Sequence, residues 1–416
     1  MRPVRRVIAV LAATAMFVAG LWTTQPGTAV AANNLGLKTI PFRIINNSGK
    51  SGRLFLYVVG NVPSMGGKSY FVSNVNGDLT IVPKIDPPGM SLGLDLGTAT
   101  TIDVQLPQLT AARIYFSIGQ GLLVMATAEG APPSAPPGWV PQDPNFNTYF
   151  DFAEFTWLDD AGGPFVSTLG MNATQVDMFA IPFLLALKGK NDAGTVITRR
   201  SGFNDLKARD KIFGDLLKAG HPWTNLIMKR NKRADALRVV APYLGIQPLG
   251  VFPTNFLAQY INQVWQKYTT EILNAESEGH TYAGGVAGGE LVFHDMAVPG
   301  DPPFKFVKPS TETAFRNELQ PIPNPPGPGP GARARAIAAL LGAAFMRTNL
   351  LTSTDLNACV VAGFYVSAPI NEYAEGFHKY ALDHLAYSFG YDDTCEQSSF
   401  IQIHDPEMMT ITLQKF

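Results

Sequence analysis

The chain has 416 residues, of which 46% are hydrophobic and only 16% are charged, with 39 glycines and 32 prolines. This composition is typical of an extracellular, β-rich protein and excludes disorder on a large scale. The formal net charge is −1, so the chain lacks the excess positive charge that favours binding to nucleic acid or to an anionic membrane.

The first 32 residues have the pattern of a signal peptide. Three arginines, Arg2, Arg5 and Arg6, come first. An apolar run at 7–22 follows, and small residues at 29–31 form a cleavage pattern. A membrane anchor is the alternative, but the run is short and no cluster of stop-transfer charges follows it. We therefore expect a secreted protein that has no membrane contact once residues 1–32 are removed.

Short strands separated by turn residues are predicted after the signal peptide. They cover residues 42–45, 54–59, 70–75, 79–82, 101–106 and 113–118, and Asn76-Gly77 forms a hairpin turn between two of them. A proline-rich loop at 131–145 follows. Strands at this spacing predict a β-sandwich or barrel lobe over residues 33–190, which a strand-like stretch within about 387–416 completes.

The middle of the chain, residues 191–386, predicts a mixed α/β lobe. Apolar residues at helical spacing indicate helices at 203–218, 232–243, 254–274, 332–347 and 371–389, with strands at 282–286 and 290–294. The fold class is therefore mainly β with α/β, and two such lobes are expected to flank a wide groove.

The chain has two cysteines, Cys359 and Cys395. In an oxidising compartment an isolated pair is most simply one disulfide, and two buried free thiols are the alternative. The sequence has no H-E-x-x-H motif and no G-x-S-x-G motif, so we expect no metal, no cofactor and no serine nucleophile.

Two apolar segments, residues 147–158 and 174–183, each contain one acid, Glu154 and Asp177. Alternation along two strands places Glu154 on the face of Phe152, and it places Asp177 on one face with Gln175 and Phe179. If the two strands are neighbours, the carboxylates face each other across a cleft, as hydrolysis of a glycosidic bond requires. The alternative is that each acid only caps a backbone group or pairs with an arginine.

Amides and aromatic rings near these acids indicate a sugar-binding surface, because amides pair with hydroxyls and rings stack on pyranoses. The candidate amides are Asn145, Asn147 and Gln175. The candidate rings are Trp139, Phe146, Tyr149, Phe152 and Trp157, although each residue alone is also common in cores and turns.

The segments NFNTYFDFAEFTW (145–157) and NATQVDMFAIP (172–182) resemble the central motif of glycoside hydrolase family 64, the thaumatin-like, laminaripentaose-producing β-1,3-glucanases. Further similar pieces follow in the expected order, namely PFRIINNSG (41–49), RIYFSIGQGL (113–122), FKFVKPST (304–311) and YDD (391–393). The resemblance therefore covers most of the chain after residue 32.

This resemblance implies a thaumatin-like β lobe, a mixed α/β lobe and a groove that binds a β-1,3-glucan strand. It implies cleavage with inversion into short oligosaccharides such as laminaripentaose, with Glu154 as the proton donor, Asp177 as the base that activates water, and Thr156 in contact with sugar. The sequence departs from the motif at Phe152-Ala153 and Ala180-Ile181, which affects the expected groove shape and product length. We further expect a monomer.

Two rival functions remain at this point. The first is a non-catalytic, thaumatin-like glucan-binding protein, which would keep the groove but would not need both acids. The second is a secreted structural or wall-associated protein with no affinity for glucan. Release of reducing sugar from laminarin separates an enzyme from both.

Overall fold

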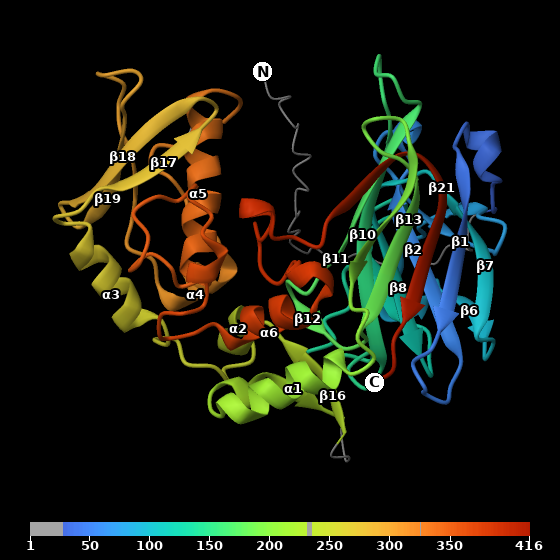
Figure 1. The fold of residues 1–416 in the computed structure, drawn as a ribbon. Helices are drawn as coiled ribbons and strands as arrows, with labels where there is room; N and C mark the ends of the chain where they lie inside the picture. The colour runs from blue at the N-terminus through green and yellow to red at the C-terminus, as the bar shows by residue number, and fades with distance from the viewer. Residues whose placement is uncertain (1–27, 231–234, 325) are drawn as a thin grey trace.

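A computed structural model describes residues 28–230, 235–324 and 326–416 (Figure 1). Residues 1–27, which form most of the expected signal peptide, lie outside the described residues. Residues 231–234, which include the start of the predicted helix 232–243, lie outside them as well. In the described ranges, no helix is both long and apolar enough to cross a membrane.

The largest element is a twelve-stranded sheet in which most neighbours are antiparallel. Its main path runs β14-β13-β21-β11-β10-β8-β2-β3-β4, with β6 beside β2 and with β1 and β7 beyond β21. The strands are β1 (Thr39–Asn46), β2 (Leu54–Asn61), β3 (Ser69–Val72), β4 (Leu79–Ile81), β6 (Leu94–Gly97), β7 (Thr101–Pro107), β8 (Thr110–Ile118), β10 (Tyr149–Asp159), β11 (Ser167–Ala173), β13 (Phe183–Lys190), β14 (Val196–Gly202) and β21 (Ile401–Leu413).

The sheet curls because β21 serves two layers. One edge of β21 pairs with β13, and the other edge pairs antiparallel with β11 at its start and parallel with β1 toward its end. The layers enclose one apolar core that contains Phe42 of β1, Val104 of β7, Phe116 of β8 and Phe155 of β10. The face of β10 that carries these core residues is therefore closed.

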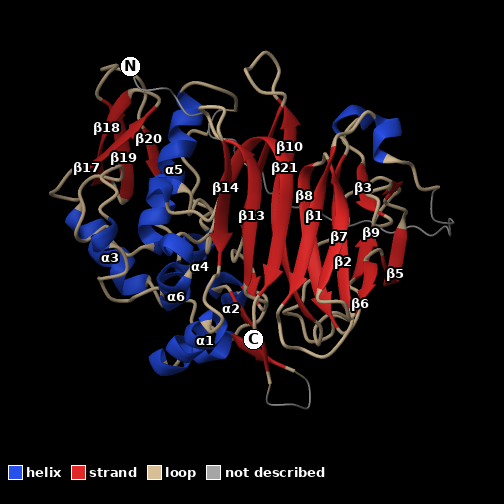
Figure 2. Ribbon diagram, turned by 45° about the vertical axis from the view of Figure 1, so that its right-hand side comes forward, coloured by secondary structure: helices blue, strands red, loops and turns tan. Residues whose placement is uncertain are grey.

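The helices and most of the small sheets pack at the β14 side of this sheet, whereas the two strands at 85–91 and 123–126 lie at its other side, near β2 and β6 (Figure 2). The helices are α1 (Ala208–Ala219), α2 (Pro242–Ile246), α3 (Ala258–Lys267), α4 (Thr311–Arg316), α5 (Pro330–Met346) and α6 (Glu372–Tyr380). The small sheets are β12 (Met178–Phe179), β16 (Ala236–Val240) and β15 (Ile227–Lys229); β17 (Leu273–Ser277), β18 (His280–Ala287), β19 (Glu290–Asp295) and β20 (Phe304–Phe306); and β5 (Ile85–Ser91) with β9 (Leu123–Ala126). A second apolar core joins these elements to the other face of β10 through Phe150 and Phe152.

The structure confirms a mostly β chain with helices, and it confirms the disulfide between Cys359 and Cys395. The large sheet continues past position 190, because β14 is its edge strand. The thaumatin-like character of the fold and the wide groove stay predictions.

Several predicted elements are wrong in type or length, and one of them is the predicted helix 371–389, which ends with α6 at Tyr380. Residues 236–240 of the predicted helix 232–243 form strand β16, because its buried run of apolar residues pairs with β15 and β12. The predicted helix 254–274 ends with α3 at Lys267, and β17 begins at Leu273. The predicted strand 174–183 is mainly a connection between β11 and β13 that contains only the two-residue strand β12.

Candidate active site

Glu154 lies on the open face of β10. Beyond Phe152 this face leaves the second core, so Glu154 and Thr156 are partly exposed and Leu158 is 38% exposed. Arg113 of β8 lies directly opposite Glu154, and its Nε and Nη2 atoms are each 2.9 Å from Oε1 of Glu154. The Glu154 side chain remains 22% exposed, so this acid is oriented by Arg113 but is still accessible.

Asp177 reaches the same region from the connection between β11 and β13. Its carbonyl oxygen accepts a hydrogen bond of 2.8 Å from the amide of Ala241, which joins this connection to the end of β16. The hydroxyl of Tyr243, in the first turn of α2, donates to Oδ1 of Asp177. Burial and the neighbouring Asp177 charge raise the pKa of Tyr243, so the phenol stays a donor at neutral pH.

Asp151 holds the Asp177 connection against β10. Its buried Oδ2 atom accepts hydrogen bonds from the amides of Ala180 and Ile181, at 2.8 and 3.0 Å. Arg209 of α1 donates to the carbonyl of Ala180 at 2.7 Å. Burial raises the pKa of Asp151 to about 7, although three backbone amides donate to it. One strand therefore carries both Glu154 and the anchor of the segment that carries Asp177.

The two acids act on the same arginine and tyrosine. Burial raises the pKa of Tyr115, and the charges of Glu154 and Asp177 raise it further. Burial acts to lower the pKa of Arg113, but Tyr115, Glu154 and Asp177 outweigh it and raise that pKa. The backbone places the two segments next to each other, because Ala173, the last residue of β11, lies directly opposite Ala153. The connection that carries Asp177 therefore leaves β11 beside Glu154.

Thr156 is also at this place. It lies two residues from Glu154 on the same face of β10, about 7 Å along the strand, and its hydroxyl accepts a hydrogen bond of 3.2 Å from the amide of Ala111.

Of the three predicted amides, two are buried and the third lies outside β10. Asn145 is 1% exposed, and both ends of its amide bond the backbone of Leu123 at 2.8 Å, so it cannot contact a polysaccharide. Gln175 is 2% exposed and its amide nitrogen donates to Ala173, so it is buried as well. Asn147 is exposed and lies in the turn before β10, seven residues before Glu154.

The predicted aromatic surface is also corrected. Phe146, Tyr149, Phe152 and Trp157 are at most 8% exposed because they fill the two cores, and Trp139 packs against the second core. None of these rings lies open beside the acids.

Sequence reasoning missed four residues of the site: Arg113, Tyr115, Asp151 and Tyr243. Arg113 and Tyr115 occur in the RIYFSIGQGL segment, so the strand was found but not its register with β10. An available signal was Asp151, a charged residue at a position where the alternation of β10 requires a buried side chain.

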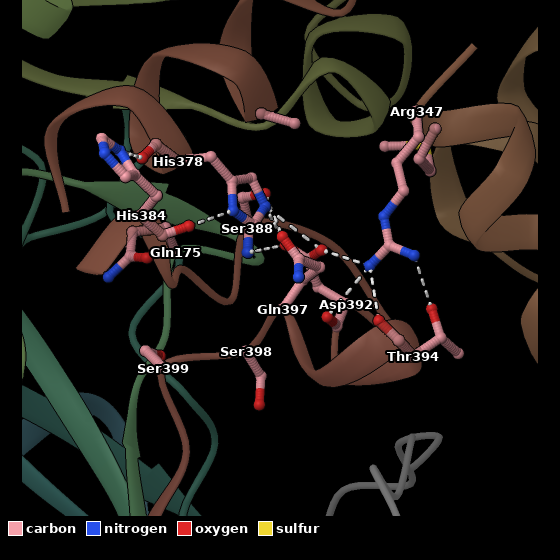
Figure 3. A network of polar contacts seen from close by, with 12 residues as sticks. Gln175, Arg347, His378, His384, Ser388, Asp392, Thr394, Gln397, Ser398 and Ser399 are labelled. Carbon is pink, nitrogen blue, oxygen red and sulfur yellow. Dashed lines mark hydrogen bonds and ion pairs between the residues drawn. The ribbon is translucent and has the colours of Figure 1, made fainter. Parts of the chain in front are cut away.

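A buried ionic network lies next to the connection that carries Asp177, near Gln175 (Figure 3). Asp392, at 0% exposure, accepts hydrogen bonds from Nη2 of Arg347 at 3.1 Å, from Nε2 of His378 at 3.0 Å, and from the amide and hydroxyl of Ser388 at 2.9 and 2.8 Å. The same loop contacts the connection directly, because the amide of Gln175 donates to the carbonyl of Tyr387 at 2.7 Å. In the part of the chain that the structure describes, no group of three or more His, Cys, Asp or Glu side chains is placed to hold a metal ion.

Comparison with known proteins identifies the class. A family model described as "Beta-1,3-glucanase" matches residues 38–413, which is most of the chain. The protein is therefore a glycoside hydrolase. Within that class, the chain belongs to glycoside hydrolase family 64.

Two relatives of similar sequence are named glucan endo-1,3-beta-glucosidase, one from an Arthrobacter species and one from Cellulosimicrobium cellulans. Each is 29% identical over 99% of this chain and 71% of the relative. The solved structure of a laminaripentaose-producing β-1,3-glucanase in complex with laminaritetraose is similar with a TM-score of 0.76 and 28% identity, over 91% of this chain and 99% of the other. The fold is also that of a family 64 domain from Clostridium beijerinckii, with a TM-score of 0.68 at 23% identity over 91% and 99% of the two chains.

Proposed function

We propose that this chain is a secreted enzyme that hydrolyses β-1,3-glucan with inversion of configuration, and that Glu154 and Asp177 are its catalytic acids. One observation carries the assignment: the connection that carries Asp177 leaves β11 beside Glu154 and is bonded to β10 through Asp151, while Glu154 and Asp177 remain partly exposed. The relatives' names and the laminaritetraose complex support β-1,3-glucan as the substrate.

In this mechanism Glu154 donates its proton to the glycosidic oxygen as the bond to the anomeric carbon breaks. Asp177 removes a proton from a water molecule that attacks the anomeric carbon from the opposite side. An inverting pair needs a separation of about 6.5–9.5 Å to admit that water. The hydroxyl of Tyr243 binds Oδ1 of Asp177, so it fixes the orientation in which the carboxylate can accept the proton.

Two finer proposals follow from the same site. Thr156 contacts the bound sugar, because it lies on the face of Glu154 and is partly exposed. The products are short oligosaccharides such as laminaripentaose, an expectation that the name of the similar laminaripentaose-producing enzyme supports.

Replacing each acid by its amide tests the assignment. Glu154→Gln and Asp177→Asn should each reduce sugar release from laminarin by at least about 100-fold, because each removes one proton-transfer group. The matched control is Glu407→Gln, since Glu407 is a 42% exposed partner of Lys188 on the large sheet; it should leave the rate within about twofold, as exposed pairs contribute little. NMR of the first product formed reports inversion as the α-anomer.

Sugar release by either amide variant at more than a tenth of the parent rate would show that the wrong acids were chosen. A parent protein that binds laminarin and releases no sugar would instead favour the non-catalytic glucan-binding protein.

A further inference from the structure

One exposed aromatic ring lies beside the acids. Among the described residues, only two aromatic side chains belong to the exposed large hydrophobic residues, Tyr391 at 50% and Phe400 at 40%. Phe400 directly precedes β21, in the segment where Figure 3 labels Ser398 and Ser399. A large ring left open to water in a chain that buries most of its aromatic residues calls for a reason.

The position of this ring follows from a glycine. Gly170 of β11 lies directly opposite Thr156 of β10, and directly opposite residues of paired strands point to the same face. A Cβ atom on Gly170 would lie 2.6 Å from Cζ and 2.9 Å from Cε2 of Phe400. The ring therefore covers Gly170 on the face that also carries Thr156 and Glu154.

A third strand adds a polar neighbour to this place. Gln402 of β21 lies directly opposite Gly170 and is partly exposed. Its neighbours Ile401 and Ile403 belong to the enclosed core, so the side chain of Gln402 points to the same open face as the ring. An open ring with a hydroxyl and an amide beside it is the arrangement that a sugar-binding site uses.

The backbone that carries Phe400 is held firmly. Ser399 is 2% exposed, its hydroxyl donates to the carbonyl of Ala173 at 2.7 Å, and its own carbonyl accepts from the hydroxyl of Ser201. These bonds join the segment to β11 and to β14. A ring presented by an anchored backbone loses little freedom when a ligand binds, which favours affinity.

We propose that Phe400 is a stacking platform for one glucosyl unit of β-1,3-glucan, bound one unit away from the bond that is cleaved. The proposal rests on the function proposed above. The ring offers its flat face to the C–H face of the pyranose, while Thr156 and Gln402 flank it with groups for the sugar hydroxyls. The place of the ring supports this register, since it covers the residue opposite Thr156, and Thr156 is about 7 Å from Glu154 along β10.

A purely structural role makes a different prediction. If Phe400 only shields Gly170 from water, any apolar side chain of similar size serves, and Phe400→Leu behaves like the parent. If the ring stacks on sugar, leucine fails because it has no flat face, and Phe400→Trp succeeds.

The test is calorimetric binding of laminaribiose to laminarihexaose by the full chain carrying Glu154→Gln, alone and with each Phe400 variant. We expect Phe400→Ala and Phe400→Leu to weaken binding about tenfold for oligosaccharides long enough to reach the ring, which corresponds to about 1.4 kcal/mol. Shorter ones should bind equally, and Phe400→Trp should stay within twofold of the parent. With Glu154 intact, Phe400→Ala should raise KM more than it lowers kcat.

Leu217→Ala is the control, because Leu217 is 60% exposed on α1 and its loss removes a comparable apolar side chain from another surface. It should leave binding at every length unchanged.

Three results would overturn the proposal. If Phe400→Ala binds every oligosaccharide as the parent does, or if Phe400→Leu binds like the parent, the ring is not a stacking platform although the enzyme assignment stands. If the Glu154→Gln parent binds no oligosaccharide at all, the proposed substrate fails and the platform fails with it.

Discussion

Replacing the buried Asp392 by asparagine should destabilise the whole chain. Asp392 compensates the charge of Arg347, which is only 2% exposed, and it also accepts from His378 and Ser388. Asparagine keeps the shape but removes the negative charge and turns an amide N–H group toward donors. Removing one partner of a buried ion pair costs about 3–5 kcal/mol, which is a large part of the roughly 5–15 kcal/mol that stabilises a folded domain.

The pH dependence has a defined sign. Burial acts to raise the pKa of Asp392, but His378 and Arg347 outweigh it and lower that pKa, so its stabilisation is lost as the pH falls below about 4. Burial acts to lower the pKa of His378, but Asp392 outweighs it and raises that pKa, so its contribution is complete below about pH 6.5 and is lost as the pH rises through the higher folded-state value. The network is strongest between these limits.

Urea unfolding at pH 5.5, followed by tryptophan fluorescence, measures the effect of Asp392→Asn. Asp103→Asn is the control, because Asp103 and its partner Arg43 are 59% and 44% exposed and such an exposed pair adds little to stability. A loss below about 1 kcal/mol for Asp392→Asn, or a loss that grows as the pH falls below 4, would refute this reasoning.

Two further predictions concern the segment that carries Asp177. Tyr243→Phe removes the hydroxyl that donates to Asp177, so the rate of sugar release from laminarin should fall about 10- to 100-fold while the melting temperature changes little; an unchanged rate would contradict this positioning role. Asp151→Asn should cost about 1–3 kcal/mol in urea unfolding at pH 5. The cost should be smaller at pH 8. Because the folded-state pKa of Asp151 is raised to about 7, the stabilisation from Asp151 decreases as the pH rises from about 4 through 7. An equal cost at both pH values would contradict the assignment.

The β10 strand could be predicted because its two faces differ in kind. Alternate residues from Ala153 to Trp157 fill the enclosed core, while Glu154 and Thr156 lie between them on a face that opens to solvent. This period of two is visible in a single sequence. The disulfide was predictable for a simpler reason, since the chain offers only one pair of cysteines.

The surroundings of Asp177 could not be predicted in the same way. Its apolar neighbours resemble a strand, but they are buried because the connection passes between two cores and not because it pairs along its length. The preceding strand, β11, is buried on both faces and therefore shows no alternation.

The amides failed for a related reason. Asn145 and Gln175 have the chemistry that binds sugar hydroxyls, yet both are buried and bond backbone groups, of Leu123 for Asn145 and of Ala173 for Gln175. The open ring of Phe400 was missed because it lies far from the acids in sequence, and only the β11–β21 pairing brings it beside them.

The position of β21 has a consequence for how the protein is made. Residues 401–413 are synthesised after β1, β11 and β13, and they fill the gap among these three strands. Until it arrives, those three strands expose unpaired edges that can associate with other chains. Assembly of the sheet must therefore wait until β21 has been synthesised, and pairings so distant in sequence form slowly. Loss of β21 would leave β1, β11 and β13 without the strand that joins them.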